Sequence, residues 1–93
     1  MNQLVPRQRV WVNATETNLV PVEDRGLAFG DGLFETVRFH GARVPLLERH
    51  LQRLSGGALR LRIALDIDDL REEISRFVAC AGAEDGILKL IVT

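Results

Sequence analysis

The alternation of apolar and polar residues predicts two long strands with two helices between them. Residues 33–40 alternate with a period of two, which is the period of a strand. One face of this strand carries Leu33, Glu35, Val37 and Phe39, and the other carries Phe34, Thr36, Arg38 and His40. Residues 86–93 form a second run that is apolar on both faces, which is typical of a strand covered on each side.

Apolar residues recur at helical spacing in two central segments. The first helix is expected to begin at Pro45 or Leu46 and to bury a stripe made of Leu47, Leu51, Leu54, Ala58 and Leu61. The second is expected to follow a cap at Asp66 or Asp68, to stop at Gly82 and to bury Leu70, Ile74, Phe77 and Val78. A glycine pair, Gly56-Gly57, interrupts the first pattern, and a helix retains such a pair more readily where a neighbour packs closely.

Turn signals divide the rest of the chain. Residues 9–12 and 19–22 are expected to form a hairpin around a polar segment, and Gly41-Ala42 is expected to turn the chain into a second hairpin that returns through residues 43–44. Residues 22–32 carry three glycines and predict a shaped loop, a common location for functional residues. Strands, two helices and a final strand together predict an α+β fold, with an antiparallel-rich sheet covered by two helices.

Length and composition narrow the possible functions. The 93 residues form one domain or part of one, and because the chain stops inside its most apolar strand we expect it to continue. The net charge of −1 gives no electrostatic reason to expect a nucleic acid or a membrane as partner. The single cysteine, Cys80, cannot form an internal disulfide, which favours a reducing compartment and the cytoplasm. Its place in an apolar helical pattern predicts a buried, inert thiol.

Candidate chemical groups are few. His40 and His50 lie in different predicted elements and lack the spacing of a metal-binding pair, so no metal site is expected. Lys89 stands between apolar residues, where a lysine can be desolvated enough to act as a nucleophile. The commoner alternative is a lysine at the margin of a sheet that extends its ammonium group to water.

Arg53 lies beside the apolar stripe of the first helix and shares a helical face with His50 and Gly57. A guanidinium at the edge of a buried face can bind a phosphate or carboxylate with two parallel hydrogen bonds. Spacing alone favours the alternative, a solvated arginine paired with Glu48 or Glu72.

Three segments resemble the signatures of one enzyme family. Residues 24–36 (Asp-Arg-Gly-Leu-Ala-Phe-Gly-Asp-Gly-Leu-Phe-Glu-Thr) resemble the opening signature of the fold-type IV pyridoxal-phosphate enzymes, the class IV aminotransferase family. Residues 47–54 (Leu-Glu-Arg-His-Leu-Gln-Arg-Leu) resemble the second signature, and residues 86–93 resemble the strand that precedes an Arg-Gly turn. The three segments follow one another in the family's order.

The resemblance implies a domain arrangement and a site. Residues 1–93 would be the small N-terminal domain of a two-domain enzyme whose cofactor is pyridoxal 5'-phosphate. Arg53 matches the arginine that binds the cofactor phosphate, and Phe34 matches a position that contributes to the substrate or neighbouring-subunit site of a homodimer. The Schiff-base lysine would lie in a C-terminal domain beyond Thr93, so no catalytic residue is expected in this chain, and Lys89 does not match that lysine.

Within the family, the resemblance favours 4-amino-4-deoxychorismate lyase, which forms 4-aminobenzoate and pyruvate from a small-molecule substrate in the pathway to folate. One alternative is a branched-chain or D-amino-acid aminotransferase of the same fold. The other is a non-catalytic pairing or regulatory domain. The 93 residues alone are expected to be inactive, because the covalent anchor of the cofactor is missing from them.

Overall fold

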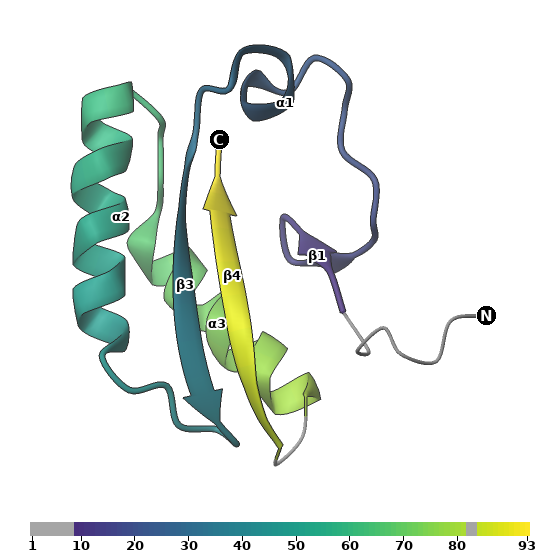
Figure 1. The fold of residues 1–93 in the computed structure, drawn as a ribbon, viewed down its shortest axis with the longest axis vertical. Coiled ribbons are helices and arrows are strands. Elements are labelled where there is room, and N and C mark those ends of the chain that lie inside the picture. The colour runs from purple at the N-terminus through teal and green to yellow at the C-terminus, as the bar shows by residue number, and fades with distance from the viewer. Residues whose placement is uncertain (1–8, 82–83) are drawn as a thin grey trace.

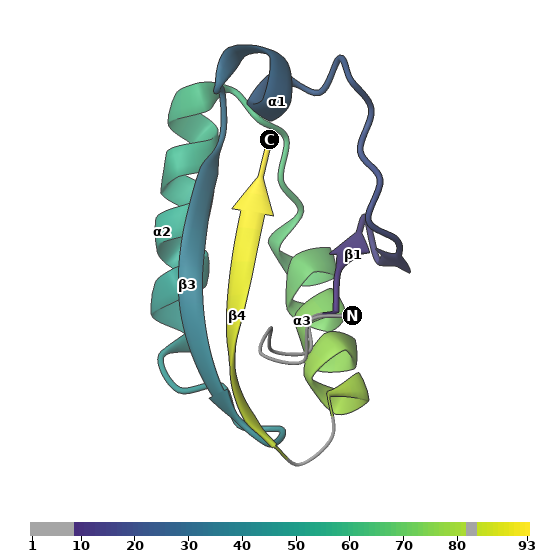
Figure 2. The ribbon, with the colours of Figure 1, turned by 45° about the vertical axis from the view of Figure 1, so that its right-hand side comes forward.

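Two long strands form a sheet, and two helices cover one of its faces (Figures 1 and 2). The computed structural model describes residues 9–81 and 84–93. The elements in chain order are β1 (Trp11–Val12), β2 (Thr15–Glu16), α1 (Arg25–Phe29), β3 (Leu33–His40), α2 (Leu47–Leu61), α3 (Ile67–Cys80) and β4 (Asp85–Val92). The predicted α+β class is confirmed, and the two helices and two long strands lie where the periodicity placed them.

The sheet pairs the middle of the chain with its end. β3 and β4 run antiparallel in register from Leu33 opposite Val92 to His40 opposite Asp85. The predicted turn at Gly41-Ala42 is confirmed, because His40 and Arg43 exchange both backbone hydrogen bonds across it. The predicted second hairpin is wrong, because this pairing stays an isolated bridge and does not extend into a strand. The reason is length: α2 begins four residues after Arg43, whereas β4 offers β3 a complete ladder.

The core lies between the sheet and the helices. Its buried residues are Val37 and Phe39 from β3, Leu51, Leu54 and Ala58 from α2, Ile63, Ile74 and Val78 from α3 and the segment before it, and Leu88, Leu90 and Val92 from β4. On the other face, Ile87 and Ile91 are about two-thirds exposed, at 68% and 66%. The expectation that β4 is covered on both sides is thus wrong for the described chain, because α2 and α3 both lie on the same side (Figure 2).

Backbone conformation sets the helix ends. Leu46 precedes α2 with a φ of 61°, so α2 starts one or two residues later than predicted. The cap predicted at Asp66 is confirmed, since its carboxylate accepts a hydrogen bond of 3.1 Å from the N–H of Asp69. The stop predicted at residue 82 lies outside the described residues. No helix in residues 9–81 and 84–93 combines the length and apolar character needed to cross a membrane.

The first hairpin is shorter than predicted. Its turn is formed by Asn13 and Ala14, whose φ angles of 51° and 65° match a tight two-residue turn that requires positive φ at both positions. The polar segment therefore closes the hairpin itself, and the predicted return strand at residues 19–22 is wrong. The hairpin contacts α3 through Trp11, whose ring meets that of Phe77 edge to face with centroids 5.2 Å apart.

The Gly56-Gly57 pair lies inside α2, and its two members have different surroundings. A Cβ on Gly57 would lie 3.2 Å from Cδ1 of Leu33, whereas a Cβ on Gly56 would meet no atom within 4 Å. The expected close neighbour is therefore β3, and it contacts only Gly57.

Replacing Gly56 with alanine is expected to stabilise the fold. The substitution restores helix propensity at an open position, which is worth about 1 kcal/mol and raises the melting temperature of a domain this size by about 4–8 °C. Thermal unfolding followed by circular dichroism measures the shift. Gly57→Ala is the matched control and should gain less, because its methyl group presses on Leu33. Equal gains in both variants would contradict the packing difference.

Candidate functional site

Arg53 extends from α2 to a carboxylate on the neighbouring strand. Its Nη2 donates hydrogen bonds of 3.0 and 3.3 Å to Oε1 and Oε2 of Glu35, and its Nε donates one of 3.4 Å to Oε2. Neither of the partners expected from spacing, Glu48 or Glu72, is the one observed, because β3 lies closer to this face of α2. The Arg53 side chain remains 72% exposed, whereas that of Glu35 is only 12% exposed.

His50 completes the cluster. It stands three residues before Arg53 on α2, which places both side chains on the same helical face. Its Nδ1 lies 2.6 Å from Oε1 of Glu35. We call Glu35, His50 and Arg53 the β3–α2 cluster. The periodicity predicted both faces correctly, but nothing in the sequence indicated that these two faces meet.

Hydrogen bonding keeps the Glu35 carboxyl group ionised. The hydrogen bond from His50, followed by those from Arg53 and the positive charge of Arg53, lowers the pKa of Glu35 below its ordinary value, although burial opposes this. A carboxylate can only accept hydrogen bonds, so Nδ1 of His50 carries the proton that it donates. The cluster therefore holds a negative carboxylate between two donors.

The arrangement leaves one edge of Arg53 available. The edge formed by Nε and Nη2 faces Glu35, while Nη1 makes no hydrogen bond in the described part of the chain. A guanidinium fork with a free edge on an exposed side chain matches an anion such as a phosphate group. A hollow of about 440 Å³ lies beside α2, and the residues that line it come from positions 52 to 65. Arg53 is not one of them.

Acid is expected to weaken the fold partly through Glu35. Because its folded pKa is lowered, the ionised carboxylate contributes stability above its unfolded pKa of about 4.3, and this contribution is lost as the pH falls through the folded value. The stability difference between the native chain and Glu35→Gln should therefore shrink from pH 7 to pH 3 in urea unfolding experiments. Glu72→Gln, which removes an exposed carboxylate from α3, is the control. A difference that stayed constant with pH would contradict the assignment.

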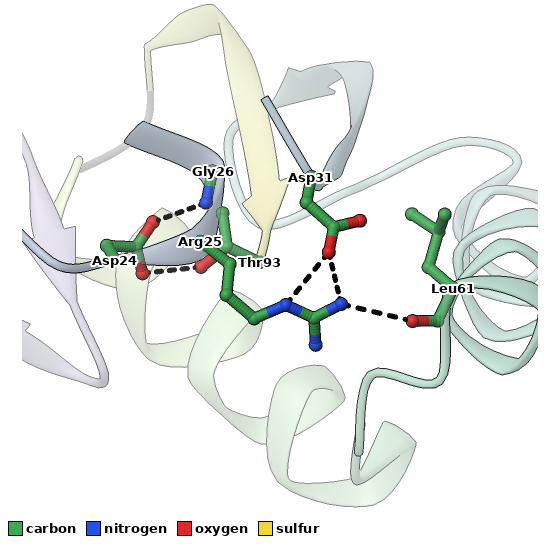
Figure 3. A network of polar contacts seen from close by, with 6 residues as sticks. All are labelled: Asp24, Arg25, Gly26, Asp31, Leu61 and Thr93. Carbon is green, nitrogen blue, oxygen red and sulfur yellow. Dashed lines mark hydrogen bonds and ion pairs between the residues drawn. The ribbon is translucent and has the colours of Figure 1, made fainter. Parts of the chain in front are cut away.

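The glycine-containing segment 22–32, predicted as a loop throughout, includes a short helix. Residues 25–29 form α1, and Asp24 caps it by accepting a hydrogen bond of 3.0 Å from the N–H of Gly26 (Figure 3). The same carboxylate accepts a hydrogen bond of 2.8 Å from the hydroxyl of Thr93. The prediction failed because a five-residue helix that contains one glycine and ends at another is too short to leave a periodic pattern.

An ion pair closes this segment over the end of the sheet. Arg25 pairs with Asp31 through Nε and Nη2, and its Nη2 also donates to the carbonyl oxygen of Leu61 at 3.4 Å (Figure 3). A Cβ on Gly32 would lie 2.9 Å from the carbonyl oxygen of Val92, so only glycine allows this close approach. The segment thus connects the start of β3, the end of β4 and the end of α2.

Phe34 lies on the opposite face of β3 from the β3–α2 cluster. Successive strand residues point to opposite faces, so Phe34 points away from the helices and is 60% exposed. The ammonium group of Lys89 lies 4.7 Å from the centre of its ring. Within this chain, therefore, Arg53 and Phe34 do not meet. Lys89 is itself exposed, as expected for a lysine that extends to water.

The burial predicted for the Cys80 thiol is wrong. The apolar pattern around it predicted a buried thiol, but the residue is exposed at the last position of α3. The apolar stripe of α3 follows Ile74 and Val78, and Cys80 lies two residues beyond that stripe.

Comparison with known proteins gives a consistent result. Residues 32–93 match the family model described as amino-transferase class IV. D-alanine aminotransferase of Listeria monocytogenes is 32% identical over 80 residues, which cover 84% of this chain and 28% of that protein. The chain thus spans less than a third of the length of such relatives.

Solved structures of other proteins are similar to this one, among them those of a lyase and of a hypothetical aminotransferase. The crystal structure of 4-amino-4-deoxychorismate lyase from Pseudomonas aeruginosa superposes with a TM-score of 0.80 and 49% identity, covering 87% of this chain and 29% of that one. A hypothetical aminotransferase from Mycobacterium tuberculosis in its PLP-bound form has a TM-score of 0.71 and 30% identity, covering 81% and 28%. The family match includes the whole of β3, α2, α3 and β4, and this chain belongs to the class IV aminotransferase family.

Proposed function

We propose that this chain is the N-terminal domain of a two-domain, pyridoxal-phosphate-dependent enzyme, and that the full-length protein is a 4-amino-4-deoxychorismate lyase. One observation carries the choice of activity: the 49% identity and TM-score of 0.80 with the lyase from Pseudomonas aeruginosa, against 32% identity with a D-alanine aminotransferase. The proposed reaction releases 4-aminobenzoate and pyruvate. The proposed enzyme works in the cytoplasm as a homodimer.

The β3–α2 cluster fits the phosphate group of the cofactor. Arg53 offers a permanently charged, planar donor with a free edge, and its side chain is exposed to a partner that lies outside this chain. When bound, pyridoxal phosphate supplies an electron sink that the protein must hold and orient. The role of Arg53 is to bind the phosphate, and the proposed Schiff-base lysine belongs to the second domain.

Phe34 is proposed to contact the substrate or the neighbouring subunit, on the face of β3 opposite Arg53. Its exposed ring, with Lys89 above it, lies on the uncovered face of the sheet, where a second domain or a neighbouring subunit can reach it. An exposed aromatic ring in this position offers apolar area to a substrate ring or to an opposing side chain. In this arrangement the two faces of β3 have separate roles.

An aminotransferase is the second candidate activity, favoured by the identity with D-alanine aminotransferase over 84% of the chain. Purified full-length protein should be incubated with 4-amino-4-deoxychorismate while 4-aminobenzoate and pyruvate are measured. In parallel, D-alanine and 2-oxoglutarate test for transamination. Release of both lyase products supports the proposal, and transamination without them would support the second candidate. If a protein that binds the cofactor catalyses neither reaction, both candidate activities are contradicted.

The 93-residue chain by itself is expected to show no lyase turnover. It contains the proposed phosphate-binding arginine but lacks the proposed covalent anchor, and binding without that anchor does not orient the reacting bonds. The measurement uses the same product assay with equal molar amounts of chain and full-length protein. Turnover by the isolated chain would show that the catalytic groups are already present in it.

A further inference from the structure

The three side chains of the β3–α2 cluster differ in how firmly they are held. Glu35 belongs to β3, where it pairs with Leu90 of β4, and its side chain is 12% exposed. The long, flexible side chain of Arg53 is 72% exposed. His50, 18% exposed, contacts the same carboxylate. The rigid partner in the cluster is therefore the carboxylate, and the flexible partner is the guanidinium.

We propose that Glu35, fixed by His50, is a positioning residue that orients the guanidinium of Arg53 toward the phosphate group of the cofactor. The inference rests on the proposed function of the site. Glu35 itself is not expected to touch the phosphate, because both groups are anionic. Its role is exerted through Arg53.

The geometry determines which part of the guanidinium is presented. Glu35 accepts from Nε and Nη2, so the side edge of the planar group is fixed against the strand. The remaining donors, at Nη1 and on the outer side of Nη2, then point along the end of the side chain. A planar group held on one edge has a defined direction on the other, which is the condition for two parallel hydrogen bonds to a phosphate.

Pre-orientation lowers the entropy lost on binding. An exposed arginine samples many rotamers, and ordering such a side chain costs about 0.5–1.5 kcal/mol of binding free energy. The contacts with Glu35 restrict those rotamers before the ligand arrives. His50 adds to this effect by fixing the carboxylate through its 2.6 Å contact, so that the strand, the histidine and the arginine form one connected unit.

Two effects of Glu35 have opposite signs, which makes the proposal testable. Its negative charge repels a phosphate, so loss of the charge alone would tighten binding. Loss of the orientation would weaken it. Two variants separate the effects: Glu35→Gln removes the charge and keeps the shape, and Glu35→Asp keeps the charge and withdraws the carboxylate by one methylene.

The experiment measures the affinity of the full-length apoenzyme for pyridoxal phosphate and for pyridoxal, which lacks the phosphate, by absorbance titration. Both variants are expected to bind pyridoxal phosphate about three- to tenfold more weakly, the size expected when one side chain loses its fixed geometry. Affinity for pyridoxal should not change. Weakened binding of both compounds would indicate a general structural defect and would overturn the proposal, as would tighter binding by Glu35→Gln.

Glu48→Gln is the matched control. Glu48 is also on α2 and also accepts two hydrogen bonds from an arginine, at 2.9 and 3.1 Å from Arg71, but it faces α3. This variant should leave both affinities unchanged, and thermal unfolding confirms that each variant is folded.

A double variant separates failure of the inference from failure of the proposed function. If Glu35 acts through Arg53, Glu35→Gln should cause no further loss of phosphate binding once Arg53→Gln is present, and only the gain from removing its negative charge can remain. Additive losses would overturn the positioning role. If Arg53→Gln alone leaves pyridoxal-phosphate affinity unchanged, the proposed phosphate site itself is wrong.

Discussion

Arg53→Gln is expected to weaken the binding of pyridoxal phosphate to the full-length protein about 100-fold. Hydrogen bonds to charged groups contribute about 1.5–3 kcal/mol, and a factor of 100 corresponds to about 2.8 kcal/mol. Glutamine retains a polar side chain but loses the charge and the fork that the geometry directs away from Glu35. Titration of the apoenzyme, followed by cofactor absorbance, measures the change.

The specificity of this effect can be checked within the same chain. Arg76→Gln removes an equal charge from an exposed position on α3. Because solvent and salt screen a distant exposed charge, this variant should change the affinity for pyridoxal phosphate by less than about twofold. Arg53→Lys keeps the charge without the fork and should lie between glutamine and the native residue. Equal losses in Arg53→Gln and Arg76→Gln would mean that only net charge matters, and the assignment of Arg53 would be wrong.

Leu54→Ala is expected to destabilise the 93-residue chain by about 2–5 kcal/mol, the range for removing a fully buried leucine side chain. Leu54 is 0% exposed and lies in the core between the sheet and the helices. Total stabilities of small domains are only about 5–15 kcal/mol, so this one change removes a large fraction of the stability. Urea unfolding monitored by the fluorescence of Trp11, which packs on α3, measures it.

A second leucine on the same helix provides the control. Leu59 is 79% exposed, so Leu59→Ala makes the same chemical change on the outer side of α2. Exposed substitutions of this kind usually stay within about 0.5 kcal/mol. Similar losses at both positions would mean that the α2 face assigned to the core is wrong.

The long elements could be predicted because each has an independent pattern. The period of two over β3 and the leucine stripe of α2 are repeated many times, so a single odd residue does not hide them. The short elements could not be predicted in this way. α1 has five residues and each strand of the first hairpin has two, which is too few for any period to be detected.

The site was predicted only in part, and for a related reason. The family resemblance indicated Arg53, and the helical pattern placed His50 on the same face. Glu35 stood on the apolar face of its strand, a signal that an ionisable residue has a partner there. Its partners could not be identified, because His50 and Arg53 lie in a different element from Glu35. They are separated from it in the sequence by 15 and 18 positions.

The sequence by itself determined which residues of β3, α2 and α3 face the core, since apolar side chains leave water whatever element covers them. Both faces of β4 are apolar, so the structure decided which of them is buried. The sequence also determined the family, through three motifs in order. Only the tertiary structure decided the partners: β3 pairs with β4 and not with the segment after His40, and Glu35 meets α2. Backbone ladders and ion pairs form between any suitable groups that approach each other, so their choice depends on how the helices and strands pack in space, which no local pattern records.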